Sequence, residues 1–171
     1  GSLSGSSCTL APIALSSDSS SCTVDYTPSA GAGTHTVSGA YQGTSLHQTS
    51  SGSFDITVNK RSTSTSVSCS PGSVAINQGT TCTATVTDTD SGSKSFPQGS
   101  VSFNNGSASG SFGSGGSCTL SQVGTGTTSS CSVSYTPSAY NGGTHTIKAS
   151  YTASDSIHAD SADATGFALT V

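Results

Sequence analysis

The sequence has no glutamate, methionine or tryptophan, and only 7% of its 171 residues are charged. Four lysine and arginine residues and a net charge of −4 do not provide the basic surface that nucleic-acid binding requires. There is no run of about 20 apolar residues, so we expect no membrane insertion. The composition therefore excludes nucleic acid and the bilayer interior as partners.

Residues that would support catalysis are also scarce. Glutamate pairs for glycoside hydrolysis are absent, and no phosphate-binding or dinucleotide glycine motif links a strand pattern to a helix pattern. Serine is so common that a Ser/His/Asp triad could be drawn from almost any region, which makes such a match uninformative. The sequence therefore predicts a protein that is not an enzyme and needs no cofactor.

Serine, threonine and 21 glycines fill the chain instead. Such a mixture can indicate disorder. Here, however, valine, isoleucine, tyrosine and phenylalanine alternate with polar residues at regular intervals, which is typical of β-strands. The pattern therefore favours a folded all-β protein.

The six cysteines form three close pairs with gaps of 13 or 14 residues, which do not fit the short C-x2–4-C spacing of zinc sites. Local disulfides fit better, although free or metal-bound thiols remain an alternative. Each bridge would close a loop worth roughly 3 kcal/mol and would indicate an oxidising compartment. The predicted bridges are Cys8–Cys22, Cys69–Cys82 and Cys118–Cys131.

Much of the second half of the chain repeats an earlier stretch. The segments SCTL, YTPSA and GTHT occur twice in the same order, and each copy ends in an apolar strand pattern, at 53–58 and 166–171. A period near 110 residues indicates tandem domains. We therefore predict a complete repeat at 60–171 and the C-terminal half of another at 1–59. We favour a fragment of a longer array; the alternative is a half-domain that another chain completes.

Seven segments of the complete repeat read as short strands, separated by Gly, Ser, Pro and Asn turns, which is typical of an all-β sandwich. They are 64–70, 81–88, 99–105, 117–122, 130–136, 144–151 and 166–171. Two-residue alternation predicts which side chains face the core. These are Cys82, Ala84, Val86, Val101, Phe103, Cys131, Val133, Tyr135, His145, Ile147, Ala149, Tyr151, Phe167, Leu169 and Val171.

The segments CTATVTD, GSVSFNN, CSVSYTPSA, GTHTIKASY and GFALTV resemble the bacterial and archaeal Ig-like repeat domains of secreted and cell-surface proteins. The resemblance covers 62–171 and, as half a repeat, 1–58. It implies Ig-like sandwiches of about seven strands in tandem, used as stalks, filaments or adhesin shafts. It implies no catalytic residues.

Aspartates in two loops could supply oxygen ligands to calcium. Asp88 and Asp90 follow the second strand pattern, Asp155 and Asp160 follow the sixth, and in a sandwich these loops meet at one pole. We favour the simpler interpretation that they are solvated loop residues. Between the repeats, Lys60 and Arg61 are likewise interpreted as a solvated linker.

Other polar and aromatic residues offer weaker candidates. His35 and His145 lie in the repeated GTHT, with His47 and His158 in the loops that follow, but their spacing favours hydrogen-bonded structural histidines over a metal site. Asn105 begins a glycosylation sequon. Tyr140, before a glycine turn, is the best candidate for an exposed aromatic contact.

Two functions follow as hypotheses. The first is a structural module of an extracellular fibre, stalk or adhesin shaft, whose partners are neighbouring copies of the repeat and which could polymerise into a filament. The second is an adhesive or accessory domain that binds a surface glycan or protein. Both place the protein outside the cell or on its surface; the repeat, the short linker and the inert surface favour the first.

Overall fold

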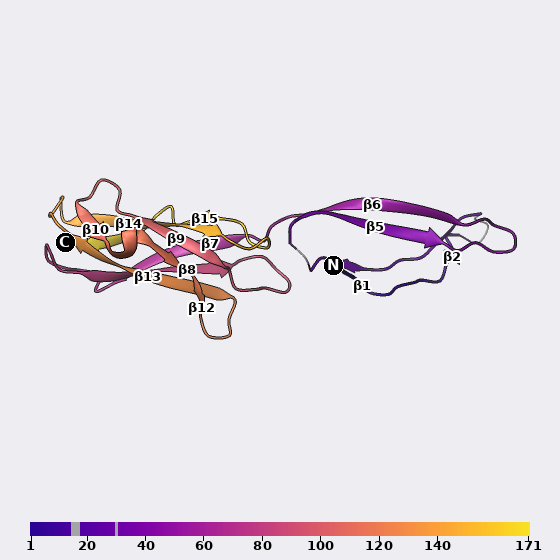
Figure 1. Ribbon diagram of the computed structural model, residues 1–171, viewed down its shortest axis with the longest axis horizontal. Helices are drawn as coiled ribbons and strands as arrows, with labels where there is room; N and C mark the ends of the chain where they lie inside the picture. The colour runs from indigo at the N-terminus through magenta and orange to yellow at the C-terminus, as the bar shows by residue number, and fades with distance from the viewer. Residues whose placement is uncertain (15–17, 30) are drawn as a thin grey trace. The chain divides into compact units, whose positions relative to one another are not determined.

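The computed structural model describes residues 1–14, 18–29 and 31–171. The chain divides into two compact units, Gly1–Asn59 and Lys60–Val171 (Figure 1). The repeat in the sequence places a boundary at the same residues. Among the described residues, none belongs to a helix long and apolar enough to cross a bilayer.

The second unit consists of two antiparallel sheets that pack face to face (Figure 1). The first contains, in spatial order, β10 (Gly110–Phe112), β13 (Thr128–Pro137), β8 (Thr80–Asp88) and β7 (Thr63–Ser70), with β12 (Ser121–Gln122) also paired to β13. The second contains β11 (Ser117–Thr119), β9 (Gly99–Asn104), β14 (Thr144–Ala153) and β15 (Ser161–Ala162), with β16 (Phe167–Thr170) also paired to β14. A 3-10 turn, η1 (Gly113–Gly116), connects β10 to β11.

Alternation along the strands predicts the core of this unit correctly. Both sheets contribute, with Val86 from the first and Val101 and Ile147 from the second fully buried. Phe167, Val171 and Cys131 are partly buried and pack against this core. The all-β sandwich expected from the sequence is confirmed.

The predicted strands are all present, with two differences. The segment 117–122 forms two strands, β11 in one sheet and β12 in the other, because the chain crosses between the sheets there. The short strands β10 and β15 were not predicted. They are only three and two residues long, too short to show an alternation that indicates a strand.

The chain enters and leaves the second unit at opposite poles. At the start of β7, Arg61 forms a parallel bridge with His158. Past the far end of β7, Ser73 forms a parallel bridge with Thr170, and the Val171 amide donates to the Gly143 carbonyl. We call the end at Arg61 the proximal pole and the end at Val171 the distal pole.

The described residues of the first unit form three strand pairs. The hairpin of β5 (Gly33–Tyr41) and β6 (Ser50–Val58) is its longest element. The shorter pairs are β1 (Ser2–Leu3) with β4 (Tyr26–Thr27) and β2 (Ala11–Pro12) with β3 (Ser20–Ser21). None of its described residues is buried.

Strand register is the same in the two units wherever their sequences correspond. Each strand pair of the first unit aligns residues whose sequence equivalents are also aligned in the second. The matching pairs are Leu3–Tyr26 and Phe112–Tyr135, Ala11–Ser21 and Ser121–Ser130, and His35–Ile56 and His145–Leu169. The first unit therefore corresponds to residues 110–171, the second half of the sandwich.

Candidate functional site

A charged cluster occupies the proximal pole of the second unit, in a chain that has few charges. The fully buried carboxylate of Asp88, the last residue of β8, accepts two hydrogen bonds from Arg61. They run from Nε to Oδ2 at 2.6 Å and from Nη2 to Oδ1 at 3.1 Å. Such a two-point contact fixes both side chains, because the guanidinium fork matches the carboxylate.

His158, in the loop between β14 and β15, extends this cluster. Its ring is 1% exposed, with Nε2 lying 3.6 Å from Asp88 Oδ2 and 3.3 Å from the Ser95 hydroxyl. Its Nδ1 lies 2.8 Å from Asp155 Oδ2. The loops that follow β8 and β14 are thereby joined to each other and to Arg61.

Backbone hydrogen bonds hold the incoming chain in the same place. The Arg61 amide donates to the Ile157 carbonyl at 2.7 Å, and the Arg61 carbonyl accepts from the Ala159 amide at 2.8 Å. The next amide, that of Ser62, donates to Asp90 Oδ2 at 2.6 Å. Arg61 is therefore an integral residue of the sandwich, and its interpretation as solvated linker is wrong. Its partners are distant in the sequence, so no local pattern indicates them.

Electrostatics keep both carboxylates of the cluster ionised. Burial opposes the charge on Asp88, but the hydrogen bond from Arg61 and the backbone donors of Ser95 and Asp90 outweigh it and hold its pKa below the usual range. Burial likewise opposes the charge on Asp155, and the hydrogen bonds from His158 and from backbone amides lower its pKa. Asp88 and Asp155 are thus carboxylates at neutral pH, and Asp88 forms an ion pair with Arg61.

The four aspartates considered for calcium are committed to donors within the protein. Asp88, Asp90 and Asp155 do gather at one pole, as the loop arrangement predicts, but the guanidinium of Arg61 takes the place expected for the cation. Asp160 is occupied as well, because its Oδ1 accepts from the Ala153 amide at 2.9 Å. Among the described residues, no group of three or more Asp, Glu, His or Cys side chains is arranged to hold a metal ion.

The three predicted disulfides are present: Cys8–Cys22, Cys69–Cys82 and Cys118–Cys131. They differ in what they connect. Cys69 and Cys82 are directly opposite each other on β7 and β8 of one sheet, whereas Cys118 on β11 and Cys131 on β13 join the two sheets. Three such bridges indicate an oxidising environment.

The repeated histidines serve a structural role. In the second unit Tyr135 Oη and His145 Nδ1 share a buried hydrogen bond of 2.8 Å, and in the first unit Tyr26 Oη and His35 Nδ1 share a partly buried hydrogen bond of 2.7 Å. The partner is thus a tyrosine hydroxyl in both units, joined for His35 by the Gly31 carbonyl. No metal ligand set forms around either histidine among the described residues.

Asn105, the sequon residue, points into the fold. Its Nδ2, the atom that a glycan would modify, donates to the Ala108 carbonyl at 2.8 Å and to Tyr135 Oη at 3.1 Å. Alternation along β9 places Asn105 on the same face as the buried Val101 and Phe103, which was a signal against an exposed sequon. A glycan at this nitrogen would have to break these contacts.

Tyr140 is exposed at the distal pole, as predicted, with 60% of its surface accessible. Beside it a polar cleft of about 410 Å³ lies between the loop after β9 and the start of β14. Its lining includes Asn104, Asn141, Thr146 and Lys148. The neighbouring loops are held together by the Ser109 amide, which donates to Asn141 Oδ1 at 2.9 Å.

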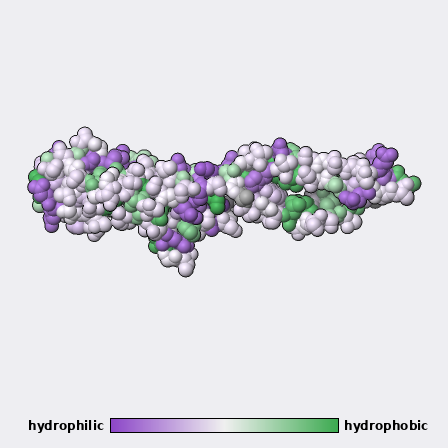
Figure 2. Space-filling model, in the orientation of Figure 1, coloured by the Kyte–Doolittle hydropathy of each residue, from purple (hydrophilic) through white to green (hydrophobic). Residues whose placement is uncertain are grey.

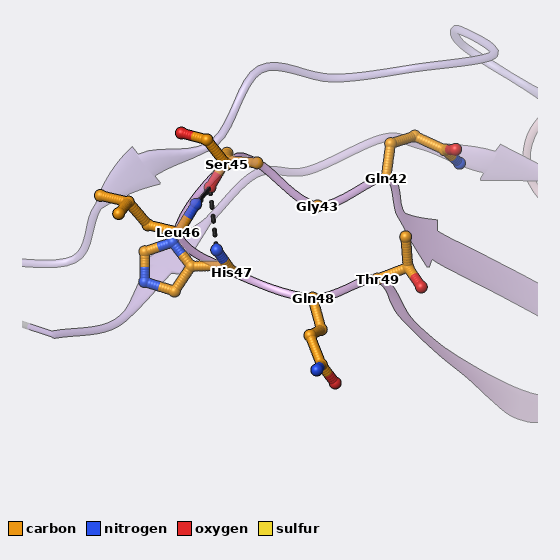
Figure 3. Close-up of a pocket in the computed structure, with 8 residues that line it drawn as sticks. Gln42, Gly43, Ser45, Leu46, His47, Gln48 and Thr49 are labelled. Carbon is orange, nitrogen blue, oxygen red and sulfur yellow. Dashed lines mark hydrogen bonds between the residues drawn. The ribbon is translucent and has the colours of Figure 1, made fainter.

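In the first unit, a shallow pocket of about 660 Å³ is formed by the β5–β6 turn, residues 42–49 (Figure 3). The hydroxyl of Thr44 accepts from the amides of Leu46 and His47, and lies 3.2 Å from His47 Nδ1. The pocket is therefore a polar turn with the Leu46 side chain projecting into solvent.

That turn is equivalent to the loop that holds His158. Thr44, Ser45, Leu46 and His47 correspond to Asp155, Ser156, Ile157 and His158. In the second loop the Asp155 carboxylate accepts from the amides of Ile157 and His158, as the Thr44 hydroxyl does in the first. The same turn thus presents a histidine in both units.

No family model and no curated protein matches this chain. The geometry of the polar cluster and of the two units therefore carries the functional argument. The membership of Arg61 and Ser95 in the cluster was not predicted from the sequence. The available signal was Asp88, which follows Cys82, Ala84 and Val86 at two-residue intervals and so falls on the inward face, where a carboxylate requires a partner.

The ionisation of Tyr151 tests the burial and the charges around it near the proximal pole. Burial, followed by the charges of Asp155 and Asp160, raises its pKa to about 12 from 10.0. The folded protein therefore retains a proton that the unfolded chain releases above pH 10, so the free energy of unfolding should fall as pH rises from 10 to 12. Urea titrations of the parent and of Tyr151→Phe measure this; equal alkaline slopes in the two would contradict it.

Proposed function

We propose that this chain is a structural module of an extracellular fibre, stalk or adhesin shaft built from tandem Ig-like domains, and that it is not an enzyme. The observation that carries the proposal is the path of the chain through the second unit. At the proximal pole Arg61 is bonded to Asp88, and the last strand of the unit, β16, reaches the distal pole. A domain with this path can be joined end to end.

Strand order supports the Ig-like assignment. The sequence of strands β10–β13–β8–β7 in one sheet and β11–β9–β14 in the other, with β16 also on β14, is the arrangement expected of Ig-type sandwiches. The shared register of the two units supports a tandem arrangement of such domains.

The short connection between the units supports a shaft. β6 ends at Val58 and Arg61 already belongs to the second unit, which leaves only Asn59 and Lys60 between them. A connection of two residues without glycine or proline restricts the motion of the domains it joins. The partners proposed are therefore neighbouring copies of the same repeat.

The disulfides and the surface support a location outside the cell or on its surface. The core of the second unit is small, so covalent bridges add stability that packing alone does not supply. The surface is rich in serine and threonine and has little charge, which suits a spacer better than a catalyst.

The proposal is tested by the mass and shape of the native assembly. Light scattering and negative-stain imaging should detect filaments whose axial repeat matches one domain, and the filaments should weaken with a reductant if the bridges maintain the domains. A monomer at all concentrations would contradict polymerisation of this chain.

A second candidate function is recognition of a glycan. Exposed Tyr140 next to the polar cleft that includes Asn104 and Lys148 favours it, because sugars are bound by stacking on aromatic rings and by hydrogen bonds from amides. Glycan-array binding that is lost in Tyr140→Ala, from a chain that forms no filaments, would favour this function over the first.

A further inference from the structure

We propose that the polar cleft beside Tyr140 in the second unit binds an acidic sugar, and that the ammonium group of Lys148 contacts the anionic group of that sugar. The inference rests on the second candidate function, recognition of a glycan, and names the class of glycan. The cleft measures about 410 Å³, which lies within the range of small-ligand sites. Lys148 is the one cation among the described residues that line it, and none of them is acidic.

The ammonium group of Lys148 has no partner within the described part of the chain. Lys148 is partly buried on β14, yet no described residue accepts a hydrogen bond from it or forms an ion pair with it. Asp163, before β16, accepts instead from the amides of Val67 and Gly166. Figure 2 shows a surface made mostly of residues of intermediate hydropathy, with strongly hydrophilic residues in scattered groups. In such a surface an unpaired cation is a specific feature, and it is free to contact a ligand.

The stem of Lys148 packs over the turn that precedes β16. A Cβ atom at Gly166 would lie 2.8 Å from Lys148 Cγ, so the missing side chain at Gly166 is what leaves room for the stem. On the other side of β14, Asn104 of β9 is directly opposite Lys148. A side chain whose stem is packed in this way loses less entropy when a ligand binds.

Two asparagines add unpaired N–H donors to the cleft. Asn104 Oδ1 accepts from the Gly106 amide at 3.3 Å, and Asn141 Oδ1 accepts from the Ser109 amide at 2.9 Å. Because a backbone amide can only donate, these bonds fix the orientation of both carboxamides and occupy their oxygens. Their Nδ2 groups have no partner among the described residues. Together with Lys148, the lining therefore suits a ligand group with anionic oxygens.

Residues that distinguish the second unit from the first gather at this cleft. Lys148 corresponds to Ser38. Residues 140–143, which include Tyr140, correspond to the shorter segment 31–33, which contains only glycine and alanine. The cation, one of the two asparagines and the neighbouring aromatic ring are thus features of the second unit alone.

The first unit also carries a carboxylate on the equivalent surface. Asp55 is equivalent to Ala168, which pairs with Thr146 of the cleft lining. Its Oδ1 accepts from the Thr36 hydroxyl at 2.6 Å. A carboxylate at this position would repel an acidic ligand, so the charges of the second unit suit such a ligand and those of the first do not.

The rest of the lining suits the uncharged part of a sugar. Ser107, Thr144 and Thr146 supply hydroxyl groups that can exchange hydrogen bonds with sugar hydroxyls. Tyr140, directly before Asn141 in the chain, offers an exposed ring for stacking. These contacts serve neutral and acidic sugars alike, and the contact with Lys148 makes the difference between them.

The test uses the full chain and three short oligosaccharides: an oligouronide, its carboxyl-reduced neutral form, and a sulfated derivative of the neutral form. Titration calorimetry should show that the acidic sugars bind at least about tenfold more tightly than the neutral one, because a charge-assisted hydrogen bond is added. Added salt should reduce this preference. The better of the two acidic sugars identifies the anionic group as a carboxylate or a sulfate ester.

Variants assign the preference to this cleft. Lys148→Gln should abolish it and leave the affinity for the neutral sugar unchanged, whereas Lys148→Arg should retain it. Lys60→Gln is the matched control, because it removes the same charge outside the cleft lining and should bind as the parent does. Ala168→Asp copies the carboxylate of the first unit and should weaken binding of the acidic sugars at least about tenfold.

Two kinds of result would overturn the inference. Equal binding of acidic and neutral sugars by the parent, or equal loss of the preference in Lys148→Gln and Lys60→Gln, would reject the role of Lys148 while recognition of a glycan stands. No binding of any of the three sugars, together with an empty glycan array, would reject the glycan function and the inference with it, and filaments of the same protein would still support the shaft.

Discussion

Arg61→Met is expected to lower the free energy of unfolding of the second unit by about 3–5 kcal/mol, because it leaves the fully buried Asp88 carboxylate without its cation. Asp88→Asn should cost less, since the Arg61 side chain is 22% exposed and can turn towards water. Urea unfolding followed by far-UV circular dichroism measures both. Lys60→Met is the matched control: it removes the neighbouring exposed charge and should change stability by less than about 0.5 kcal/mol.

The same variant should change the response to acid. In the parent, the pKa of Asp88 is lower in the folded state, so the unfolded chain takes up the proton first and stability falls as pH drops below about 4. In Arg61→Met the uncompensated burial raises that pKa, and the acid loss should become shallower, with Asp155 still contributing. Parallel acid curves for the parent and Arg61→Met would show that Arg61 does not set the ionisation of Asp88.

Reduction of both disulfides in the second unit is expected to unfold it. Each bridge spans a sequence separation of 13 residues, and closing such a loop is worth roughly 3 kcal/mol in the unfolded chain. A loss of about 6 kcal/mol equals the whole stability of many small domains. Loss of the cooperative urea transition on reduction is the expected observation.

Paired cysteine variants separate the contributions. Cys69→Ala with Cys82→Ala, and Cys118→Ala with Cys131→Ala, should each cost about 3 kcal/mol. Cys8→Ala with Cys22→Ala is the control, because that bridge lies in the first unit and should leave the second unit's transition unchanged. A reduced protein that unfolds at the parent's urea concentration would show that packing alone sustains the sandwich.

Much of the sandwich could be predicted from the sequence because period-two alternation is a local property. Val86, Val101 and Ile147 lie in strands whose polar and apolar residues alternate regularly, and all three are buried as expected. The bridges could be predicted too, because each joins cysteines only 13 or 14 residues apart in the sequence. Short strands such as β10 escaped prediction because pairing with β13, and not their own residues, makes them strands.

The polar cluster could be predicted only in part, because its partners are distant in the sequence. Arg61 and Asp88 are 27 residues apart. A Lys-Arg pair after a strand has the same local sequence pattern whether its side chains are solvated or buried. Asp88 and Asn105, in contrast, continue the inward-facing positions of their strands. Extending the alternation by one step would have assigned both side chains to the interior.

The scarcity of charge in the second unit has a consequence for how its two ends respond to the surroundings. The ion pairs lie at the proximal pole, whereas the distal loops, residues 71–79, 105–109 and 138–143, contain no ionisable side chain except Tyr140. Salt screens interactions between charges and leaves hydrogen bonds and apolar contacts largely intact. A contact made by the distal loops alone should therefore change little with ionic strength.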